Sequence, residues 1–309
     1  MILTVTLNAA IDKRYQVKKL RLGEVNRVLE CQCSAGGKGL NVARVAVLAG
    51  EQATAFGFAG GHTGALLEEL AGRDGITAGF VHVGGESRIC LNIAEEETGL
   101  QTEILEGGLE ISDEEISQME RGYRELLRDA EAVVISGSLP RGMEADVYVR
   151  MIQEAKRASV PVLLDTSGPA LQECVRAAPV LIKPNQDEIR QLTGKEELSR
   201  EELFLAAERL GKQGISYVVI SLGQEGAVMA VSSGIYQAAV PKIETVNTVG
   251  CGDSMMAGFA IGIKNHWEPP KILRYASALA AANARQARTG YFAQKDFEEL
   301  YADILVQKQ

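Results

Sequence analysis

Short apolar runs rich in β-branched residues recur along the 309-residue chain and predict buried strands. These runs occupy residues 2–7, 132–136, 160–165, 180–183 and 217–222. Segments with a helical period of apolar positions lie between them, at residues 39–48, 63–70, 113–127, 146–158 and 200–211. Alternating strands and helices predict right-handed βαβ units. The expected fold is therefore a doubly wound α/β fold, with a mostly parallel sheet covered by helices on both faces.

Two regions, residues 13–34 and 86–105, break this alternation. In the second region Ile89, Leu91 and Ile93 alternate with polar residues, as expected for antiparallel strands with one solvated face. No Pro/Gly/Ser-rich linker separates either region from the rest of the chain. Residues 1–309 are therefore expected to form one domain, in which the two insertions build a small antiparallel sheet that could act as a lid.

The composition is that of a globular protein, with 46% hydrophobic and 24% charged residues. The formal net charge of −9 argues against nucleic-acid and anionic-membrane partners, because those surfaces are bound through excess Lys and Arg. The N-terminal residues have no basic region or long apolar run, and no segment reaches membrane-spanning length, so a cytoplasmic location is expected. The five cysteines are an odd number, which fits free thiols in a reducing compartment.

A glycine-spaced loop at residues 247–259 runs directly into an apolar helix. Its glycines let backbone N–H groups approach a bound group, and the helix N-terminus adds partial positive charge. Gly250, Cys251 and Gly252 are therefore expected to form an anion hole. Asp253 would repel an anion there, but it suits a base that accepts a hydroxyl proton. The alternative for Asp253 is the more common role of a helix N-cap.

A second glycine-rich turn, at residues 34–44, also enters a predicted helix. It is not a Walker A loop, because Gln32 stands where the first glycine would be and Gly39 follows the lysine. The first loop does not satisfy the dinucleotide fingerprint, since Met255 occupies the third glycine position. A P-loop NTPase and a Rossmann oxidoreductase are therefore both disfavoured.

Taken together, the two glycine-rich motifs resemble the two signatures of the PfkB (ribokinase-like) carbohydrate kinase superfamily. The resemblance covers nearly the whole chain and is closest to the 1-phosphofructokinase and tagatose-6-phosphate kinase subfamily. Further matching segments are residues 4–12, 23–27, 101–104, 135–140, 183–185 and 221–223. The resemblance implies phosphoryl transfer from ATP with Mg²⁺, a doubly wound domain with a small lid sheet, and a homodimer formed through that lid.

On the acceptor side, the resemblance implies a sugar-phosphate site of six residues: Asp12, Gly37, Lys38, Asn41, Arg88 and Ser138. Asp12 and Asn41 would bond sugar hydroxyls, while Lys38 and Arg88 would pair with the phosphate that the acceptor already carries. Without the resemblance, Asp12 would be a turn residue and Arg88 a solvated strand charge.

On the nucleotide side, the resemblance implies a second group of six residues: Lys183, Asn185, Ser221, Gly223, Thr248 and Asn283. Asn283, in a helix expected at residues 278–287, would line the adenine pocket, and the alternative is a buried helix asparagine. Glu188 completes an Asn-x-x-Glu spacing that would organise Mg²⁺ through water. Its alternative is a first-turn helix glutamate favoured by the helix dipole.

The implied mechanism is in-line transfer, in which Asp253 accepts the proton of the attacking sugar hydroxyl. The expected acceptor is D-fructose 1-phosphate, giving fructose 1,6-bisphosphate. The alternative is D-tagatose 6-phosphate, giving tagatose 1,6-bisphosphate, toward which residues 101–105 and 287–291 lean. A non-catalytic sugar-phosphate sensor is a third possibility, and the intact Asp253, Gly250 and Gly252 speak against it.

Two positions depart from the pattern of the superfamily. Ala9 replaces the usual proline of the first-strand motif and removes no reacting group. Cys251 stands where Ala or Ser is usual, and the change should be tolerated because this residue contributes its backbone N–H. A helix N-terminus is expected to lower the pKa of the Cys251 thiol, while the neighbouring Asp253 opposes that effect.

Overall fold

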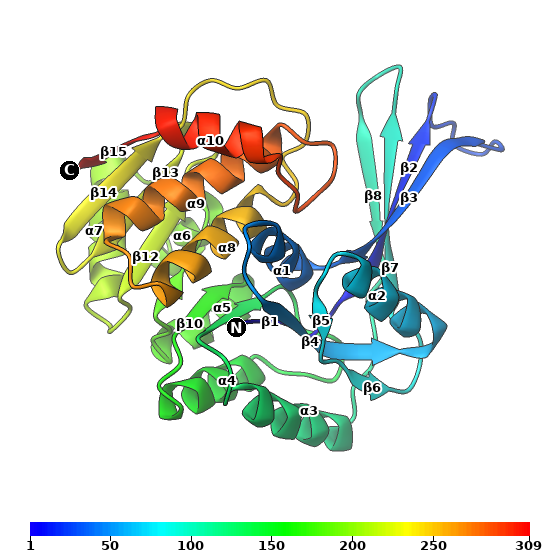
Figure 1. The fold of residues 1–309 in the computed structure, drawn as a ribbon, viewed down its shortest axis with the longest axis horizontal. Helices are drawn as coiled ribbons and strands as arrows, with labels where there is room; N and C mark the ends of the chain where they lie inside the picture. Colours follow the sequence, from blue (N-terminus) through cyan, green and yellow to red (C-terminus); the bar gives the residue numbers. More distant parts are fainter.

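The computed structural model describes residues 1–309 and contains two separate sheets (Figure 1). The centre of the large, eleven-stranded sheet is parallel and consists of β5 (Thr77–Ala78), β4 (Ala53–Gly60), β1 (Ile2–Thr6), β9 (Ala132–Ser136), β10 (Val162–Asp165), β11 (Leu181–Ile182) and β12 (Tyr217–Ser221). An antiparallel edge follows, made of β13 (Ala227–Val231), β14 (Gly234–Ala239) and β15 (Leu305–Lys308). The short β6 (Val81–Val83) also pairs with β4.

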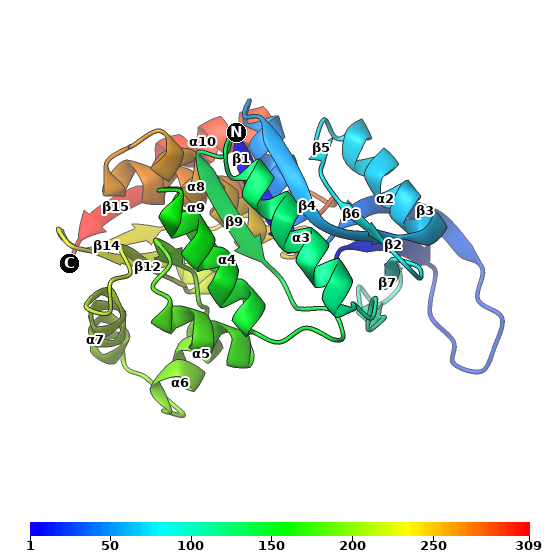
Figure 2. The ribbon, with the colours of Figure 1, turned by 90° about the horizontal axis from the view of Figure 1, so that it is seen from below.

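Helices cover both faces of the large sheet (Figure 2). One layer contains α1 (Lys38–Leu48), α2 (Gly61–Arg73), α8 (Cys251–Lys264), α9 (Pro269–Ala284) and α10 (Gln294–Asp303). The other contains α3 (Asp113–Leu126), α4 (Asp146–Arg157), α5 (Gly168–Arg176), α6 (Gln186–Thr193) and α7 (Arg200–Gly211). Successive strand residues point to opposite faces, so Ile2 and Val219 join the first apolar core and Leu3 and Val218 the second. No helix combines the length and the apolar character needed to cross a membrane.

The small sheet has four strands and stands beside the main body in Figure 1. Its strands are β2 (Ala10–Val17), β3 (Val28–Gly36), β7 (Arg88–Glu95) and β8 (Gln101–Leu105). The hairpins β2/β3 and β7/β8 are antiparallel, as predicted. The two hairpins meet through a parallel pair, β2 and β7, which their order in the chain did not indicate. The small sheet is therefore one surface rather than two independent hairpins.

The doubly wound fold is confirmed. All five predicted strands and all five predicted helices are present, with bounds that differ by a few residues. The predicted elements omit β4, because its Ala- and Gly-rich sequence lacks the β-branched signal of its neighbours. The helix expected at residues 278–287 is the end of α9, which begins at Pro269, a residue favoured at the first helical position.

Helix α8 is buried from Asp253 to Ile263, and it packs closely against α9. Gly258 makes this approach possible, because a Cβ placed there would lie 2.5 Å from the Cα of Ala276. The crossing therefore depends on the absence of a side chain at this position. Since α8 carries Asp253 in its first turn, its packing also determines where that carboxylate lies.

We expect Gly258→Ala to reduce the free energy of unfolding by about 1–3 kcal/mol, because the methyl group overpacks a backbone contact. Gly72→Ala in α2 is the matched control, since no atom lies within 4 Å of the Cβ that it adds. The control should leave stability unchanged or raise it by up to about 1 kcal/mol. Urea denaturation of both variants measures the difference, and equal midpoints would contradict the close α8–α9 contact.

Candidate active site

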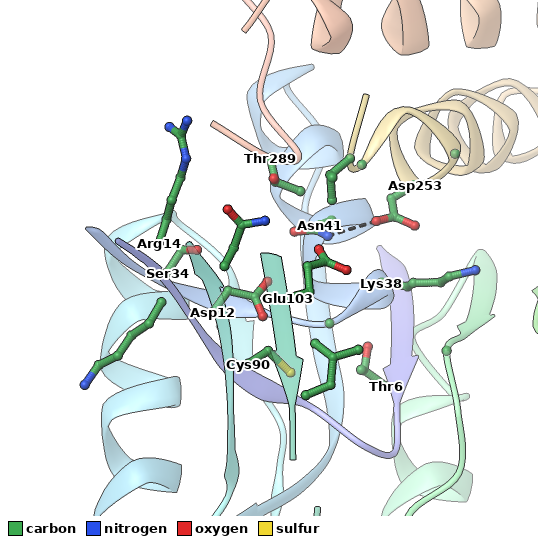
Figure 3. Close-up of a pocket in the computed structure, with 18 of the residues that line it drawn as sticks. Thr6, Asp12, Arg14, Ser34, Lys38, Asn41, Cys90, Glu103, Asp253 and Thr289 are labelled. Atoms are coloured by element: carbon green, nitrogen blue, oxygen red, sulfur yellow. Dashed lines mark hydrogen bonds between the residues drawn. The ribbon is translucent and has the colours of Figure 1, made fainter. Parts of the chain in front are cut away.

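A cavity of about 640 Å³ opens between the large sheet and the small sheet. Its floor follows four parallel strands: Thr6 ends β1, Gly137 follows β9, Asp165 ends β10 and Lys183 follows β11. Ligands of open α/β sheets bind at this carboxyl edge. The small sheet provides the facing wall, which includes Asp12, Arg14, Ser34, Cys90 and Glu103 (Figure 3).

The wall of the cavity carries more positive than negative side chains, although the chain as a whole has a net charge of −9. Six cationic residues line it: Lys13, Arg14, Lys38, Arg88, Lys183 and Arg288. Four carboxylates line it: Asp12, Glu103, Asp165 and Asp253. A local excess of positive charge in a cleft attracts anionic ligands. The cavity is therefore suited to phosphorylated molecules.

Asp253 lies in the first turn of α8, and its carboxylate faces the cavity while remaining only 6% exposed. Its Oδ2 accepts a hydrogen bond from Asn41 Nδ2 at 2.8 Å, the dashed line in Figure 3. The N-cap of α8 is Gly250, at φ 84°, and no side chain caps the helix. The N-cap interpretation of Asp253 is therefore wrong, because its carboxylate points at Asn41 rather than at the helix backbone.

The surroundings of Asp253 favour a proton acceptor at neutral pH. Burial, together with the nearby Asp165, raises the pKa of Asp253 to about 6, against the lowering effects of Lys38, Asn41 and Lys183. The carboxylate is ionised at pH 7 yet more basic than an ordinary aspartate. A base whose pKa lies close to the working pH is well matched to general base catalysis.

Asp165 is a buried carboxylate that the sequence analysis did not assign to the site. Its Oδ1 accepts from Lys38 Nζ at 3.2 Å, and its Oδ2 lies 3.5 Å from Lys183 Nζ. Burial alone would raise the pKa of Asp165, but Lys183 and Lys38 together hold it below its ordinary value. Burial alone would lower the pKa of Lys38, and Asp165 and Asp253 together raise it instead. Asp165 therefore fixes two ammonium groups at the cavity. Its place at the end of a predicted strand is the signal that could have identified it.

The N-terminus of α8 presents free donors beside Asp253. The amides of Gly252 and Asp253 make no hydrogen bond within the protein, as is usual in the first turn of a helix. A Cβ on Gly252 would lie 3.3 Å from Lys183 Nζ, so the glycine brings the ammonium close to these amides. Free amides, the helix dipole and an ammonium group together can bind phosphate oxygens.

The backbone amide of Cys251, expected to join the anion hole, is already hydrogen-bonded within the turn. Its amide donates to Thr248 O at 3.3 Å, and its thiol packs against Asn283 at 3.4 Å instead of lining the cavity. Burial raises the pKa of the Cys251 thiol, an effect that the hydrogen bond from Asn283 only partly opposes. The expectation of a lowered thiol pKa is therefore wrong.

Asn283 is fully buried in α9 and joins two loops. Its Nδ2 donates to Val249 O at 3.0 Å, and its Oδ1 accepts from the amides of Gly290 and Tyr291 at 2.9 and 3.2 Å. It does not line the cavity. These contacts match the buried-asparagine interpretation, in which the residue holds the loop before α8 against the segment after α9.

The other nucleotide-side residues lie on both sides of the cavity edge. Lys183 lines the cavity, while Asn185 and Ser221 form an isolated parallel bridge just beyond it. Gly223 and Thr248 are exposed and lie outside the cavity. The structure thus brings the segments of Asn185 and Ser221 side by side, next to Lys183.

Glu188 and Asn185 form a capping box at the start of α6. Asn185 Oδ1 accepts from Glu188 N at 2.9 Å, and Glu188 Oε2 accepts from Asn185 N at 2.8 Å. The first-turn role of Glu188 is therefore present, and its other oxygen makes no hydrogen bond. No group of three or more His, Cys, Asp and Glu side chains is arranged to hold a metal ion. Magnesium commonly uses one or two protein carboxylates together with phosphates and water, so this donor set fits Mg²⁺ bound with a nucleotide.

All six acceptor-side residues line the cavity: Asp12, Gly37, Lys38, Asn41, Arg88 and Ser138. Arg88 Nε donates to Asn8 O at 3.1 Å and its Nη1 to Glu106 O at 3.2 Å, which leaves Nη2 free for a ligand. Burial raises the pKa of Asp12 to about 6, against the opposing effect of Arg44 and Arg88. The carboxylate of Asp12 makes no hydrogen bond within the protein, so it is free to accept from a sugar hydroxyl.

The facing wall also contains polar residues that the sequence analysis did not identify. Four of them form a row across the paired strands, in the order Gln32 on β3, Arg14 on β2, Asn92 on β7 and Glu103 on β8. This row of four lies beside the row that contains Asp12, on the same face of the small sheet. The alternation of strand residues, counted from Asp12, could have identified them.

Known proteins resemble this chain in sequence and in fold. Residues 3–296 match the sequence model described as pfkB family carbohydrate kinase. A putative phosphofructokinase from Staphylococcus aureus is similar with TM-score 0.87 and 27% identity, covering 100% of this chain and 99% of that chain. The phosphofructokinase-2 of Escherichia coli, in complex with fructose-6-phosphate, has TM-score 0.88 and 25% identity over 97% of this chain and 98% of that chain. A possible 1-phosphofructokinase from Thermotoga maritima has TM-score 0.86 and 25% identity over 100% of this chain and 99% of that chain.

We expect Asp165→Asn to lower the free energy of unfolding by about 3–5 kcal/mol at pH 7, because Lys183 is left as an uncompensated buried charge. The pKa of Asp165 lies below 3.8 in the folded protein, so the ionised carboxylate stabilises the fold above about pH 4. The difference from the wild type should therefore shrink as the pH falls below that value.

Asp187→Asn is the control, because Asp187 is exposed and pairs with Arg190 at the surface. Its effect should stay within about 1 kcal/mol. Urea denaturation at several pH values measures both variants. Equal stabilities at pH 7 would mean that the lysines do not need Asp165 as a partner.

Proposed function

Because the chain belongs to the pfkB family of carbohydrate kinases, we propose that it transfers a phosphoryl group from ATP, with Mg²⁺, to a hydroxymethyl group of a ketohexose phosphate. The lead acceptor is D-fructose 1-phosphate, which gives fructose 1,6-bisphosphate. The observation that carries this proposal is the buried carboxylate of Asp253, whose pKa is about 6 and which lies between the acceptor-side residues and the free amides of α8.

Asp253 acts as the general base in the proposed mechanism. A sugar hydroxyl that enters beside Asn41 and Asp12 meets the Asp253 carboxylate, which accepts its proton as the oxygen attacks the γ-phosphorus. The amides of Gly252 and Asp253 bind the oxygens of the transferred group. Lys38 and Lys183, oriented by Asp165, neutralise the charge that develops around the transferred group. Lys38 thereby takes a different role from the pairing with the acceptor's own phosphate that was expected of it.

The nucleotide would lie along the segments of Asn185 and Ser221, with its phosphates directed toward Lys183 and the start of α8. Mg²⁺, when bound, supplies neutralisation of the nucleotide phosphates. Glu188 would hold it through water by the carboxylate oxygen that the capping box leaves free.

The phosphate of the acceptor accounts for the cationic wall. Arg88 keeps one free nitrogen at the cavity, and Arg14 faces the same space from the neighbouring strand row. A neutral sugar would need none of these charges. The fructose-6-phosphate in the complex of the E. coli relative is also a ketohexose phosphate, which supports an acceptor of this class.

D-tagatose 6-phosphate is a second candidate acceptor because of one segment of the cavity wall. Residues 287–291 resemble the tagatose kinases, and Ala287, Arg288 and Thr289 all line the cavity. In D-fructose 1-phosphate the phosphate is on C1 and the reacting hydroxyl on C6, whereas in D-tagatose 6-phosphate the two positions are exchanged. The identity of the acceptor therefore depends on which end faces Asp253.

We further propose that the small sheet is a lid over the acceptor and takes part in a homodimer. Large apolar side chains are exposed on its strands and on its connecting loops, namely Leu22, Val25, Val28, Leu29 and Leu100. Exposed apolar groups gathered on one part of a surface are typical of an interface.

An ADP-release assay with MgATP and separate acceptors tests the proposal. We expect turnover with D-fructose 1-phosphate to exceed turnover with D-tagatose 6-phosphate, D-fructose 6-phosphate and unphosphorylated D-fructose. Preference for tagatose 6-phosphate would establish the second candidate. Binding of sugar phosphates without ADP release from any of them would indicate a sensor and contradict the kinase mechanism.

We expect Asp253→Asn to lower kcat by roughly 10²–10⁴-fold, because the amide cannot accept the hydroxyl proton. In the wild type, kcat/KM should rise with pH through about 6, since the base acts when Asp253 is ionised. The contribution of Asp253 to that rise should be absent from the residual activity of the variant, while the contribution of Asp12, whose pKa is also about 6, stays in place. Initial rates between pH 5 and 8 measure both effects.

Arg88→Ala is the comparison variant for Asp253→Asn. It should raise KM for the sugar phosphate more than KM for ATP, because the lost contact is made to the acceptor's phosphate. Turnover of Asp253→Asn close to that of the wild type, in a folded protein, would remove Asp253 from the mechanism.

A further inference from the structure

Arg44 is the largest fully buried side chain of the protein, with 2% of its surface exposed. It lies in α1, one turn after Asn41, and does not line the cavity. Its Nε donates to Asp74 Oδ2 at 2.7 Å, and its Nη1 donates to Asn41 Oδ1 at 2.8 Å. A buried charge is costly unless its donors are satisfied, and this one is satisfied on every side.

The bond to Asn41 determines the orientation of that amide. An arginine can only donate, and a carboxylate can only accept, so Asn41 must turn its oxygen to Arg44 and its NH₂ to Asp253. The flipped amide would place donor against donor on one side and acceptor against acceptor on the other. Arg44 therefore decides which atom of Asn41 faces the Asp253 carboxylate.

The remaining donors of Arg44 reach the end of the small sheet and the segment after α9. Nη2 donates to the carbonyl of Ala35, at the end of β3 where the small sheet joins α1. Nη1 also reaches Thr289 O at 3.4 Å, in the segment that lines the cavity after α9. A Cβ on Gly290 would lie 3.0 Å from Nη1, so this segment packs directly on the guanidinium.

We propose that Arg44 is a positioning residue, which fixes the amide of Asn41 so that its NH₂ holds the Asp253 carboxylate toward the acceptor. Through its bond to Ala35, Arg44 also connects this arrangement to the end of β3 in the small sheet. The proposal rests on the proposed function, because it takes Asp253 as the base. A merely structural role is the competing explanation, in which Arg44 serves only to neutralise Asp74.

Arg44→Lys separates the two explanations, because lysine keeps the charge beside Asp74 but cannot bond Asp74, Asn41 and Ala35 in the planar fork. We expect kcat to fall by roughly 10–100-fold, with a smaller change in KM for ATP. The acidic limb of the kcat/KM profile should move up by about 0.5–1 pH unit, because the Asn41 bond lowers the pKa of Asp253 and would be weakened.

Asp74→Asn is the matched control, since it removes the ion pair and leaves the Arg44–Asn41 bond available. It should lower the melting temperature while the acidic limb stays in place. If instead Asp74→Asn shifts the limb as much as Arg44→Lys does, Arg44 acts through the ion pair and the proposal is wrong. Should Arg44→Lys fail to fold, Arg44→Gln is measured in its place through the ¹³C carboxyl signal of Asp253, because loss of the Arg44 charge also raises the pKa of Asp12 and would shift the limb by another route.

A double-mutant cycle tests whether the effect passes through Asn41. Added to Asn41→Ala, Arg44→Lys should cause no further shift of the limb. A full additional shift would show that Arg44 acts by another route and would overturn the proposal.

A measurement without substrate keeps the two hypotheses distinguishable. The ¹³C carboxyl signal of Asp253, assigned by its loss in Asp253→Asn, should titrate near pH 6 in the wild type and at higher pH in Arg44→Lys. That shift, in a protein that phosphorylates no sugar, would leave the positioning role intact and refute the proposed function. An unchanged signal in an active enzyme would refute the positioning role alone.

Discussion

The burial of the Asp253 carboxylate is the constraint on which the rest of the site depends. An ionised carboxylate removed from water is unstable unless donors and opposite charges compensate for the lost hydration. Asn41 donates a hydrogen bond to this carboxylate, and Lys38 and Lys183 provide positive charge near it. Both lysines, however, are paired with Asp165. The compensation is therefore incomplete, and the carboxylate keeps a pKa of about 6. A fully compensated aspartate would be a weaker base.

Backbone conformation brings these groups together from distant parts of the chain. Asn41 and Asp253 are 212 positions apart, yet each lies in the first turn of a helix that begins at a glycine of positive φ. Gly37, at φ 108°, and Gly250, at φ 84°, turn α1 and α8 sharply away from their preceding segments. The two helices pack against each other on one face of the sheet, so their N-termini meet at its carboxyl edge.

These properties explain what could be predicted from the sequence. The glycine spacings and the strand–helix alternation are local signals, so the fold and the two turns could be predicted. The acceptor-side residues were implied by the resemblance to a kinase family, and the structure brings all six to one cavity. Asp165 and Arg44 were not identified, although Asp165 ends a predicted strand, because a buried charge is recognised by its partners. Lys38 lies 127 positions from Asp165, and Asp74 lies 30 positions from Arg44. Asn283 is a different case. The resemblance placed it at the adenine pocket, but its amide bonds Val249 and Gly290 in two loops, which only the structure reveals.

The ion pairs of the cavity determine which cations remain available for an acceptor's phosphate. Lys38 and Lys183 are shared with Asp165, and Arg288 is paired with Asp74. Arg88 bonds two carbonyls and retains one nitrogen, while Arg14 extends along the wall of the cavity in Figure 3. The uncommitted positive charge thus lies on the small sheet, at the opposite side of the cavity from α8. A sugar phosphate would be drawn in with its phosphate toward that sheet, which leaves its free hydroxymethyl end facing Asp253.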